Sequence, residues 1–318
     1  MPDGATHSQF PNLNCAYNAT FQPGKLSLGL VVPLEAYRVG AEPSMERHIE
    51  RVQLAETLGF SALWLRDVPF NVPSFGDAGQ MFDPFVYLGL LSGATRDIGL
   101  GVASIILPLR HPAHVAKAAA TADQLSNGRL LLGVASGDRP EEYPAMGMTY
   151  QDRGERFRDA LAYIRAMAEA HPVHQGSHGA LSGRVDMLPK PTAGRLPVLI
   201  TGGSQQAPDW IAEHSDGWMT YPRDARAQAH VVQDYRARTP VDKPVMQSLY
   251  IDLLPEPDAR PRPIHLGFQT GTDFLLSYLR ELRASGINHV ALNLRFNGAD
   301  VEETMKRIAG DVLPEFEE

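Results

Sequence analysis

Apolar and polar positions follow one pattern that recurs eight times along the chain. A short apolar run is followed each time by a longer segment in which apolar residues return every three or four positions. The first pattern is typical of a buried strand and the second of a helix packed on one side. The predicted strands cover residues 28–32, 62–65, 98–107, 130–135, 198–201, 218–220, 245–251 and 289–293, and the predicted helices cover residues 44–59, 83–94, 111–125, 152–169, 206–214, 225–238, 272–284 and 300–308.

Residues that begin and end helices support several of these boundaries. Ser44 is expected to cap the first predicted helix, and Gly59 is expected to end it. Asp83 followed by Pro84 predicts an N-cap with proline at the first helical position of the second helix. Asn-Gly at positions 127–128 predicts the turn into the strand at 130–135.

Eight strands that alternate with eight helices favour an α/β fold, the (β/α)8 TIM barrel, over a doubly wound sheet. A chain of 318 residues is long enough for two domains, but no linker is long or biased enough to divide it. We therefore expect one barrel domain at residues 26–318. It is preceded by an N-terminal arm at residues 1–25 that either packs outside the fold or is partly disordered.

Two insertions interrupt the regular alternation. Residues 171–197, after the fourth predicted helix, are rich in turn residues and are expected to form a loop or a small hairpin. The segment LLPEPDARPRP, after the seventh predicted strand, is rich in proline and is expected to lack regular structure.

The composition of the chain argues against some classes of binding partner and indicates the cellular compartment. Acidic residues outnumber basic ones by 37 to 29, and the net charge of -8 argues against a nucleic acid or a membrane surface as partner. The single cysteine, Cys15, excludes an intramolecular disulfide. The chain has no signal-peptide pattern and no apolar run of about 20 residues, so we expect a cytoplasmic protein.

Small and polar residues follow two neighbouring predicted strands, at the end of a parallel barrel where ligands bind. Ser136-Gly137 follows the fourth strand, and Thr201-Gly202-Gly203-Ser204 follows the fifth. The two glycines of the second segment let main-chain amides approach an anion. Ser204 is expected to stand where a helix begins, so that its hydroxyl and the first amides face the same point. The alternative is an ordinary turn capped by serine.

Four further side chains are candidates, each with two interpretations. Arg153 begins the fourth predicted helix, where a cation is disfavoured, so it either meets a bound anion or is a solvated surface residue. Arg66 and Asp67 follow the second strand and either bind substrate and move a proton or form ion pairs at the rim. His111 either caps the third helix or points into the pocket. No metal site is expected, because the histidines lack ligand spacing.

At this point the chain resembles the bacterial luciferase-like flavin monooxygenase superfamily. The resemblance covers about residue 26 to the C-terminus, apart from the insertion near residues 253–266. The carrying segments are ALWLRDVPF, TRDIGLGVASIILPLRHPAHVAKAAATADQLSNGRLLLGVASGDRP and VLITGGSQQAPDWIAEHSDGW. The second segment is the specific one, and its residues in the order of the family pattern are His111-Pro112, Asp123, Ser126, Gly128 and Arg129.

The resemblance implies a barrel that binds reduced FMN, or the deazaflavin F420 in a sister branch. It implies that the end of the third strand contacts the flavin ring, often through an unusual cis peptide, which maps here to Ala103-Ser104. It also implies that the loop after the fourth strand lines the cofactor site. The cofactor phosphate is then held by Arg153 and by the loop at residues 201–204.

One departure from the family concerns the acid–base residues. Luciferases carry a histidine pair just after the second strand, and this chain reads Arg66-Asp67-Val68-Pro69 there. We take Arg66 and Asp67 as the substitutes, with His111 as a further catalytic candidate. Retained turnover after Asp67→Asn would remove that role from Asp67.

The expected function is that of a two-component monooxygenase that acts on a small, fairly apolar organic substrate. A separate flavin reductase would supply the reduced FMN, and a homodimer through barrel helices two and three is expected from the family. An F420-dependent hydride-transfer enzyme is the alternative, although residues 201–213 carry no basic side chain for a longer anionic tail. A non-catalytic flavin-binding protein is a further alternative, because the chain lacks the histidine pair that luciferases carry after the second strand. A hydrolase or aldolase would need a metal cluster or a lysine at a strand end, and this sequence shows neither.

Overall fold

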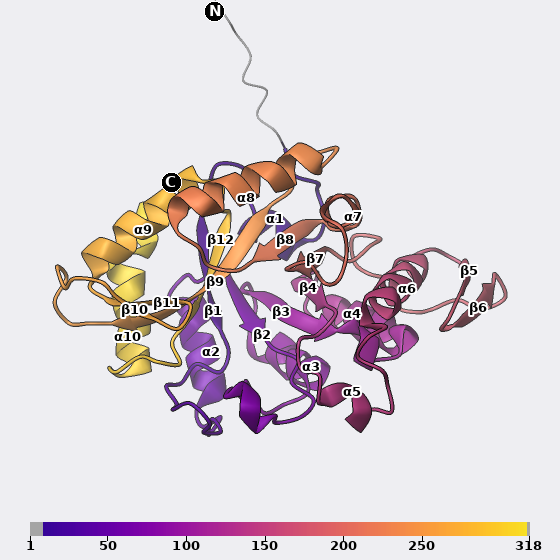
Figure 1. The fold of residues 1–318 in the computed structure, drawn as a ribbon, viewed down its shortest axis with the longest axis horizontal. Helices are drawn as coiled ribbons and strands as arrows, with labels where there is room; N and C mark the ends of the chain where they lie inside the picture. The colour runs from indigo at the N-terminus through magenta and orange to yellow at the C-terminus, as the bar shows by residue number, and fades with distance from the viewer. Residues whose placement is uncertain (1–8, 317–318) are drawn as a thin grey trace, which may run out of the picture.

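The structure is a computed structural model that describes residues 9–316. Eight parallel strands pair side by side, and the pairings between β8 and β9, β9 and β12, and β12 and β1 close them into a barrel (Figure 1). The predicted TIM barrel is therefore confirmed. Its strands are β1 (Ser27–Val31), β2 (Ala62–Leu65), β3 (Gly99–Ile106), β4 (Leu130–Ala135), β7 (Val198–Thr201), β8 (Gly217–Thr220), β9 (Val245–Leu253) and β12 (His289–Asn293).

Helices pack around the outside of the barrel. They are α2 (His48–Thr57), α3 (Pro84–Ala94), α4 (Pro112–Leu125), α6 (Arg153–Ala166), α7 (Pro208–His214), α8 (Ala225–Arg238), α9 (Thr272–Ala284) and α10 (Val301–Asp311). Short elements are α5 (Glu142–Ala145) and the 3-10 turns η1 (Pro73–Phe75), η2 (Leu107–Leu109) and η3 (Leu313–Phe316).

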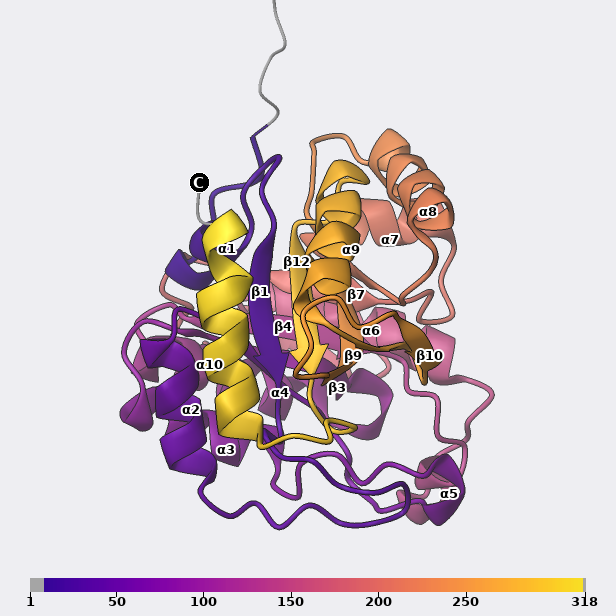
Figure 2. The same cartoon turned by 90° about the vertical axis from the view of Figure 1, so that its left-hand side faces the viewer.

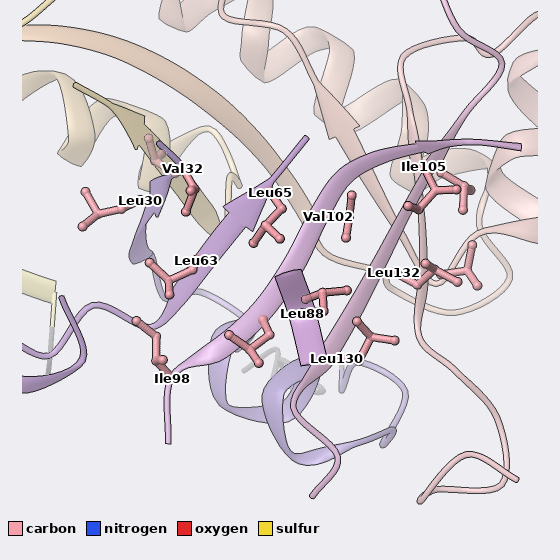
Figure 3. Close-up of a cluster of buried hydrophobic side chains, with 14 of the residues drawn as sticks. Leu30, Val32, Leu63, Leu65, Leu88, Ile98, Val102, Ile105, Leu130 and Leu132 are labelled. Atoms are coloured by element: carbon pink, nitrogen blue, oxygen red, sulfur yellow. The ribbon is translucent and has the colours of Figure 1, made fainter. Parts of the chain in front are cut away.

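Alternating side chains on each strand build two separate apolar layers. Leu63 and Leu65 of β2 face the helices and join the large outer core, while Trp64 between them faces the barrel interior. Figure 3 shows the outer layer, where side chains from β1 to β4 gather near Leu88 of α3. Gly101 makes room for the interior indole, because a Cβ there would lie 2.3 Å from the Trp64 ring.

Most predicted boundaries agree with the structure, and one helix start is a correction. The strands predicted at 130–135, 198–201 and 289–293 coincide with β4, β7 and β12. Asp83 caps α3 as predicted, since its carboxylate accepts from two amides of the first turn. Ser44 does not cap the first barrel helix. The carboxylate of Glu35 binds the Ser44 amide and hydroxyl, and α2 starts later, after Arg47.

The described part of the N-terminal arm covers the floor of the barrel. Helix α1 (Cys15–Thr20) lies at the N-terminal ends of the strands, at the end of the molecule opposite to α5 (Figure 2). Tyr17 is fully buried, and its hydroxyl donates to the carbonyl of Asp216 at 2.6 Å. Asn14 caps α1 and donates to the Asp123 carboxylate at 2.9 Å.

Both insertions form hairpins. The first contains β5 (Val173–Gly176) and β6 (Gly179–Ser182), as the turn-rich sequence predicts. The second is a correction, because the end of the proline-rich segment is ordered as β10 (Arg262–Ile264), which pairs with β11 (Gly267–Thr270). Strand β11 in turn lies beside β9. Pro263 is tolerated because β10 is the edge of the sheet, where one side needs no amide donors.

A helix that could cross a membrane would have to be long and apolar, and residues 9–316 contain none. The same residues contain no group of three or more His, Cys, Asp or Glu side chains placed to hold a metal ion.

Candidate active site

A cavity of about 870 Å³ opens at the C-terminal ends of the barrel strands. Residues from all eight strands or the loops that follow them contribute to its wall. A volume of this order suits a cofactor or a small-molecule ligand. Eleven of the twelve candidate residues line it, namely Arg66, Asp67, Ala103, Ser104, Ser136, Gly137, Arg153, Thr201, Gly202, Gly203 and Ser204.

His111 is the candidate that the structure places elsewhere. Its Nδ1 accepts from the amide of Ala113 at 3.2 Å, so the imidazole caps α4. The ring also contacts Tyr163 and His178 on the outer side of the barrel, and it is not part of the cavity wall. The capping alternative is therefore the one observed, and the catalytic assignment of His111 is corrected.

The loop after β7 forms a tight turn that lines the cavity. Gly202, Ser204 and Gln205 adopt φ values of 55°, 40° and 59°, and such left-handed turns form anion-binding concavities. Within residues 9–316, the amides of Gly203, Ser204 and Gln205 donate to no acceptor. Ser204 does not cap a helix, because its hydroxyl donates to the Thr201 carbonyl at 2.8 Å and α7 begins only at Pro208.

Arg153 lies beside this loop. A Cβ on Gly154 would come 2.7 Å from the Cβ of Gln205, so the start of α6 and the loop are in contact. The Arg153 guanidinium stacks on the Tyr150 ring at 3.7 Å and donates to the Tyr150 carbonyl at 3.0 Å. Its Nε is buried with no hydrogen-bond partner within residues 9–316. A cation and three free amides at one end of the cavity fit a phosphate group.

The end of β3 carries a cis peptide between Ala103 and Ser104. This is the conformation that the family resemblance implies at this place. The Ser104 hydroxyl hydrogen-bonds to the Thr201 hydroxyl, and both residues line the cavity. The floor of the cavity and the loop after β7 are therefore joined directly.

A charged network in the cavity wall centres on Asp77, which was not among the candidates. Its carboxylate pairs with Arg66 and with Arg295, whose Nη1 is 3.0 Å away, and accepts from the Tyr37 hydroxyl at 2.9 Å. Burial opposes ionisation of Asp77, but Arg66, the Gly79 amide and Arg295 outweigh it and hold its pKa below the ordinary value. Asp77 lies in the long loop between β2 and α3, where the strand-end rule gives no signal.

Asp67 forms an ion pair at the rim of the barrel, which was one of its two interpretations from the sequence. Its carboxylate accepts two hydrogen bonds from Arg110, at 2.9 and 2.7 Å, and one from the Ile106 amide at 3.1 Å. The side chain is 1% exposed. Arg110 also pairs with Asp83, the N-cap of α3, so this network ties the rim of the barrel to a helix start.

Glu142 is a buried carboxyl in the cavity wall and was also missed from the sequence. It is 2% exposed, and its Oε1 lies 3.9 Å from Nη1 of Arg139. Neither of these two atoms has a hydrogen-bond partner within residues 9–316. Burial raises the pKa of Glu142 to about 7, and the nearby Arg139 only partly opposes this.

The Glu142→Gln variant is expected to change how stability depends on pH. The folded protein holds the Glu142 proton up to a pH of about 7, whereas the unfolded chain releases it near the ordinary value of 4.5. The folded state thus binds more protons in this window, and wild-type stability falls as pH rises through it. Denaturation midpoints measured from pH 4.5 to 7.5 should fall less steeply for E142Q. Parallel profiles would contradict the assignment.

Comparison with known families matches residues 27–265 to the luciferase-like monooxygenase family. An uncharacterized protein of Mycobacterium bovis is 32% identical over 233 residues, which cover 68% of this chain and 82% of that protein.

Two solved structures share the fold at low sequence identity. An F420-dependent secondary alcohol dehydrogenase, in complex with an F420-acetone adduct, superimposes with a TM-score of 0.75 at 17% identity, covering 92% of this chain and 100% of that one. The oxygenating constituent of 3,6-diketocamphane monooxygenase from Pseudomonas putida, in complex with FMN, gives a TM-score of 0.73 at 14% identity, covering 92% and 99%.

Proposed function

The chain belongs to the luciferase-like monooxygenase family, and from this premise we propose that it is an FMN-dependent, two-component monooxygenase. The observation that carries the choice of FMN is the group of free amides beside the unpartnered Arg153 Nε. Arg153 is the cationic side chain of the cavity wall that adjoins the free amides of Gly203, Ser204 and Gln205. One guanidinium and one turn suit a single terminal phosphate.

The residues of the chain would bind and orient the cofactor. Arg153 and the loop after β7 would hold the phosphate, and Ala103, Ser104 and Ser136 would lie along the cavity floor against the ring. Reduced FMN, when bound, supplies the electrons with which oxygen reacts. Because residues 9–316 form one barrel, we propose that a separate flavin reductase delivers the reduced cofactor.

The proposal includes a homodimer that packs through the second and third barrel helices. Val86 and Leu90 on α3 and Leu125 on α4 are exposed apolar side chains. A monomeric sedimentation profile would remove this part of the proposal.

An F420-dependent hydride-transfer enzyme is the second candidate. The likeness in fold to the F420-dependent secondary alcohol dehydrogenase supports it. It is disfavoured by the loop after β7, because residues 201–213 carry no basic side chain that would meet a longer anionic tail.

The test is an anaerobic calorimetric titration of the protein with FMN and with F420, each oxidised and reduced. We expect reduced FMN to bind more tightly than either form of F420. Preference for F420 would move the protein to the hydride-transfer group, and binding of neither would overturn both candidates. Oxygen consumption with reduced FMN should then rise when a substrate is added, which a passive flavin carrier would not show.

A further inference from the structure

The hairpin of β10 and β11 is fixed to the end of β9 by contacts that only one residue type permits. Gly267 stands opposite Tyr250 in the register, and a Cβ on Gly267 would lie 1.7 Å from the Tyr250 carbonyl oxygen. The Tyr250 amide donates to the carbonyl of Leu266 at 3.2 Å. Leu266 itself has a φ of 49°, which turns the chain at the hairpin tip. The tip is therefore held at the mouth of the cavity.

The tip carries an imidazole into a cluster of three rings. His265 lies with its centroid 5.6 Å from that of Tyr250 and 6.4 Å from that of Phe296, and the last two are 5.2 Å apart. The three rings come from the hairpin, from β9 and from the loop after β12, and all line the cavity. The His265 imidazole and the Tyr250 hydroxyl form no hydrogen bond within residues 9–316, so both are available to a ligand.

A partly exposed cation stands beside these rings. Arg66 shares the Asp77 carboxylate with Arg295, whose guanidinium carbon lies 5.2 Å from the Phe296 ring centroid, and the Arg66 side chain is 21% exposed at the cavity wall. Arg66 and Arg295 share the single carboxylate of Asp77, which leaves a surplus of positive charge. Such a surplus favours a ligand group that accepts hydrogen bonds.

The ring cluster and the phosphate-binding loop lie on different strands around the barrel mouth. In the circular strand order, β9 lies two strands from β7, and β12 lies three strands from it. A cofactor with its phosphate at Arg153 would leave the rings at the other end of the cavity for a second molecule.

We propose that Tyr250, His265 and Phe296 form the substrate subsite, and that it takes an apolar molecule bearing a carbonyl or carboxylate oxygen. The rings pack against the apolar body, and His265, Tyr250 and Arg66 bind the oxygen. This inference rests on the proposed function, since it assigns the remaining end of the same cavity. It makes His265, which belongs to an insertion, a residue that determines specificity.

The test uses acetophenone, benzoate and toluene as probes, because they share a ring and differ in the oxygen. His265→Phe keeps an aromatic ring and removes both nitrogens, and Tyr250→Phe removes one hydroxyl. His230→Phe is the matched control, because His230 is exposed on α8 away from the cavity wall. Affinities come from calorimetry, and imidazole signals come from ¹H–¹⁵N spectra in which His265 is identified by its loss in H265F.

We expect acetophenone or benzoate to bind about three- to tenfold more weakly to H265F than to wild type, and toluene to bind both equally. The same probe should shift the His265 imidazole signals. A preference for benzoate would assign a carboxylate, and a preference for acetophenone a carbonyl. Equal affinities for wild type and H265F, unshifted His265 signals, or no binding of any probe would each overturn the proposal.

A separate FMN titration keeps this inference distinct from the proposed function. H265F should retain the wild-type affinity for FMN, because the phosphate end of the cavity is unchanged. If wild type bound the probes but not FMN, the cofactor assignment would fail and the subsite would stand. If FMN bound and the probes did not discriminate, the subsite alone would fail.

Discussion

Replacing Asp77 with alanine is expected to lower the free energy of unfolding by about 2–3 kcal/mol. The substitution leaves the Arg66 and Arg295 guanidinium groups without their shared carboxylate, and the Arg295 side chain is only 4% exposed. We place the loss below that of a fully buried pair because solvent reaches part of Arg66. Urea denaturation at pH 7 measures it.

Asp258→Ala is the matched control, because Asp258 is an exposed acidic residue in the proline-rich insertion. Its effect should stay within about 0.5 kcal/mol. Equal losses in the two variants would show that the Asp77 network does not stabilise the fold.

The stability difference between wild type and D77A should depend on pH in one direction. The pKa of Asp77 is lowered from 3.8 in the folded protein, so the folded state binds this proton less readily than the unfolded chain does. The stabilisation is therefore complete above the unfolded value and is lost as pH falls through the lower folded value. The two denaturation curves should converge in acid below a pH of about 4 and stay apart at neutral pH.

Arg153→Ala is expected to weaken FMN binding by about 10- to 150-fold, or about 1.5–3 kcal/mol. The reason is the loss of a charge-assisted contact to phosphate beside the free amides of the loop after β7. Riboflavin lacks the phosphate, so its affinity should be the same for wild type and R153A. Calorimetry with both flavins measures the two values.

Arg158→Ala provides the control for this prediction, because Arg158 is exposed on the same helix. It should bind FMN as wild type does. An unchanged FMN affinity in R153A, or an equal loss for riboflavin, would reject Arg153 as the phosphate ligand.

The barrel could be predicted from the sequence because its strands are continuous apolar runs bounded by turn residues. The strand at 130–135 is an example, since Asn127 and Gly128 take the positive φ values that its turn requires. Features that depend on distant partners could not be predicted in this way. Helix α1 is ordered by the burial of Tyr17 under the barrel, and β10 is ordered by pairing with β11.

Much of the site could be predicted because one rule applied to it. Parallel strands bring their C-terminal ends together, so residues that follow β2, β4 and β7 meet in one cavity. The rule failed for Asp77 and His265, which come from a long loop and an insertion, where no strand end marks them. It also gave no means to tell that Ser44 would bind the Glu35 carboxylate instead of capping α2, or that His111 would turn outward as a cap.

The pairing of β1 with β12 joins residues that leave the ribosome far apart in time. Ser27 pairs with His289, and synthesis of the intervening chain takes roughly 10–50 s at typical rates. Throughout that interval the edge of β1 has no partner on one side, and an open strand edge is a site for pairing with other chains. The barrel therefore cannot close until β12 has been synthesised. A chain that ends before β12 would leave this edge without its partner, and we expect such a truncated chain to aggregate more readily than the full chain.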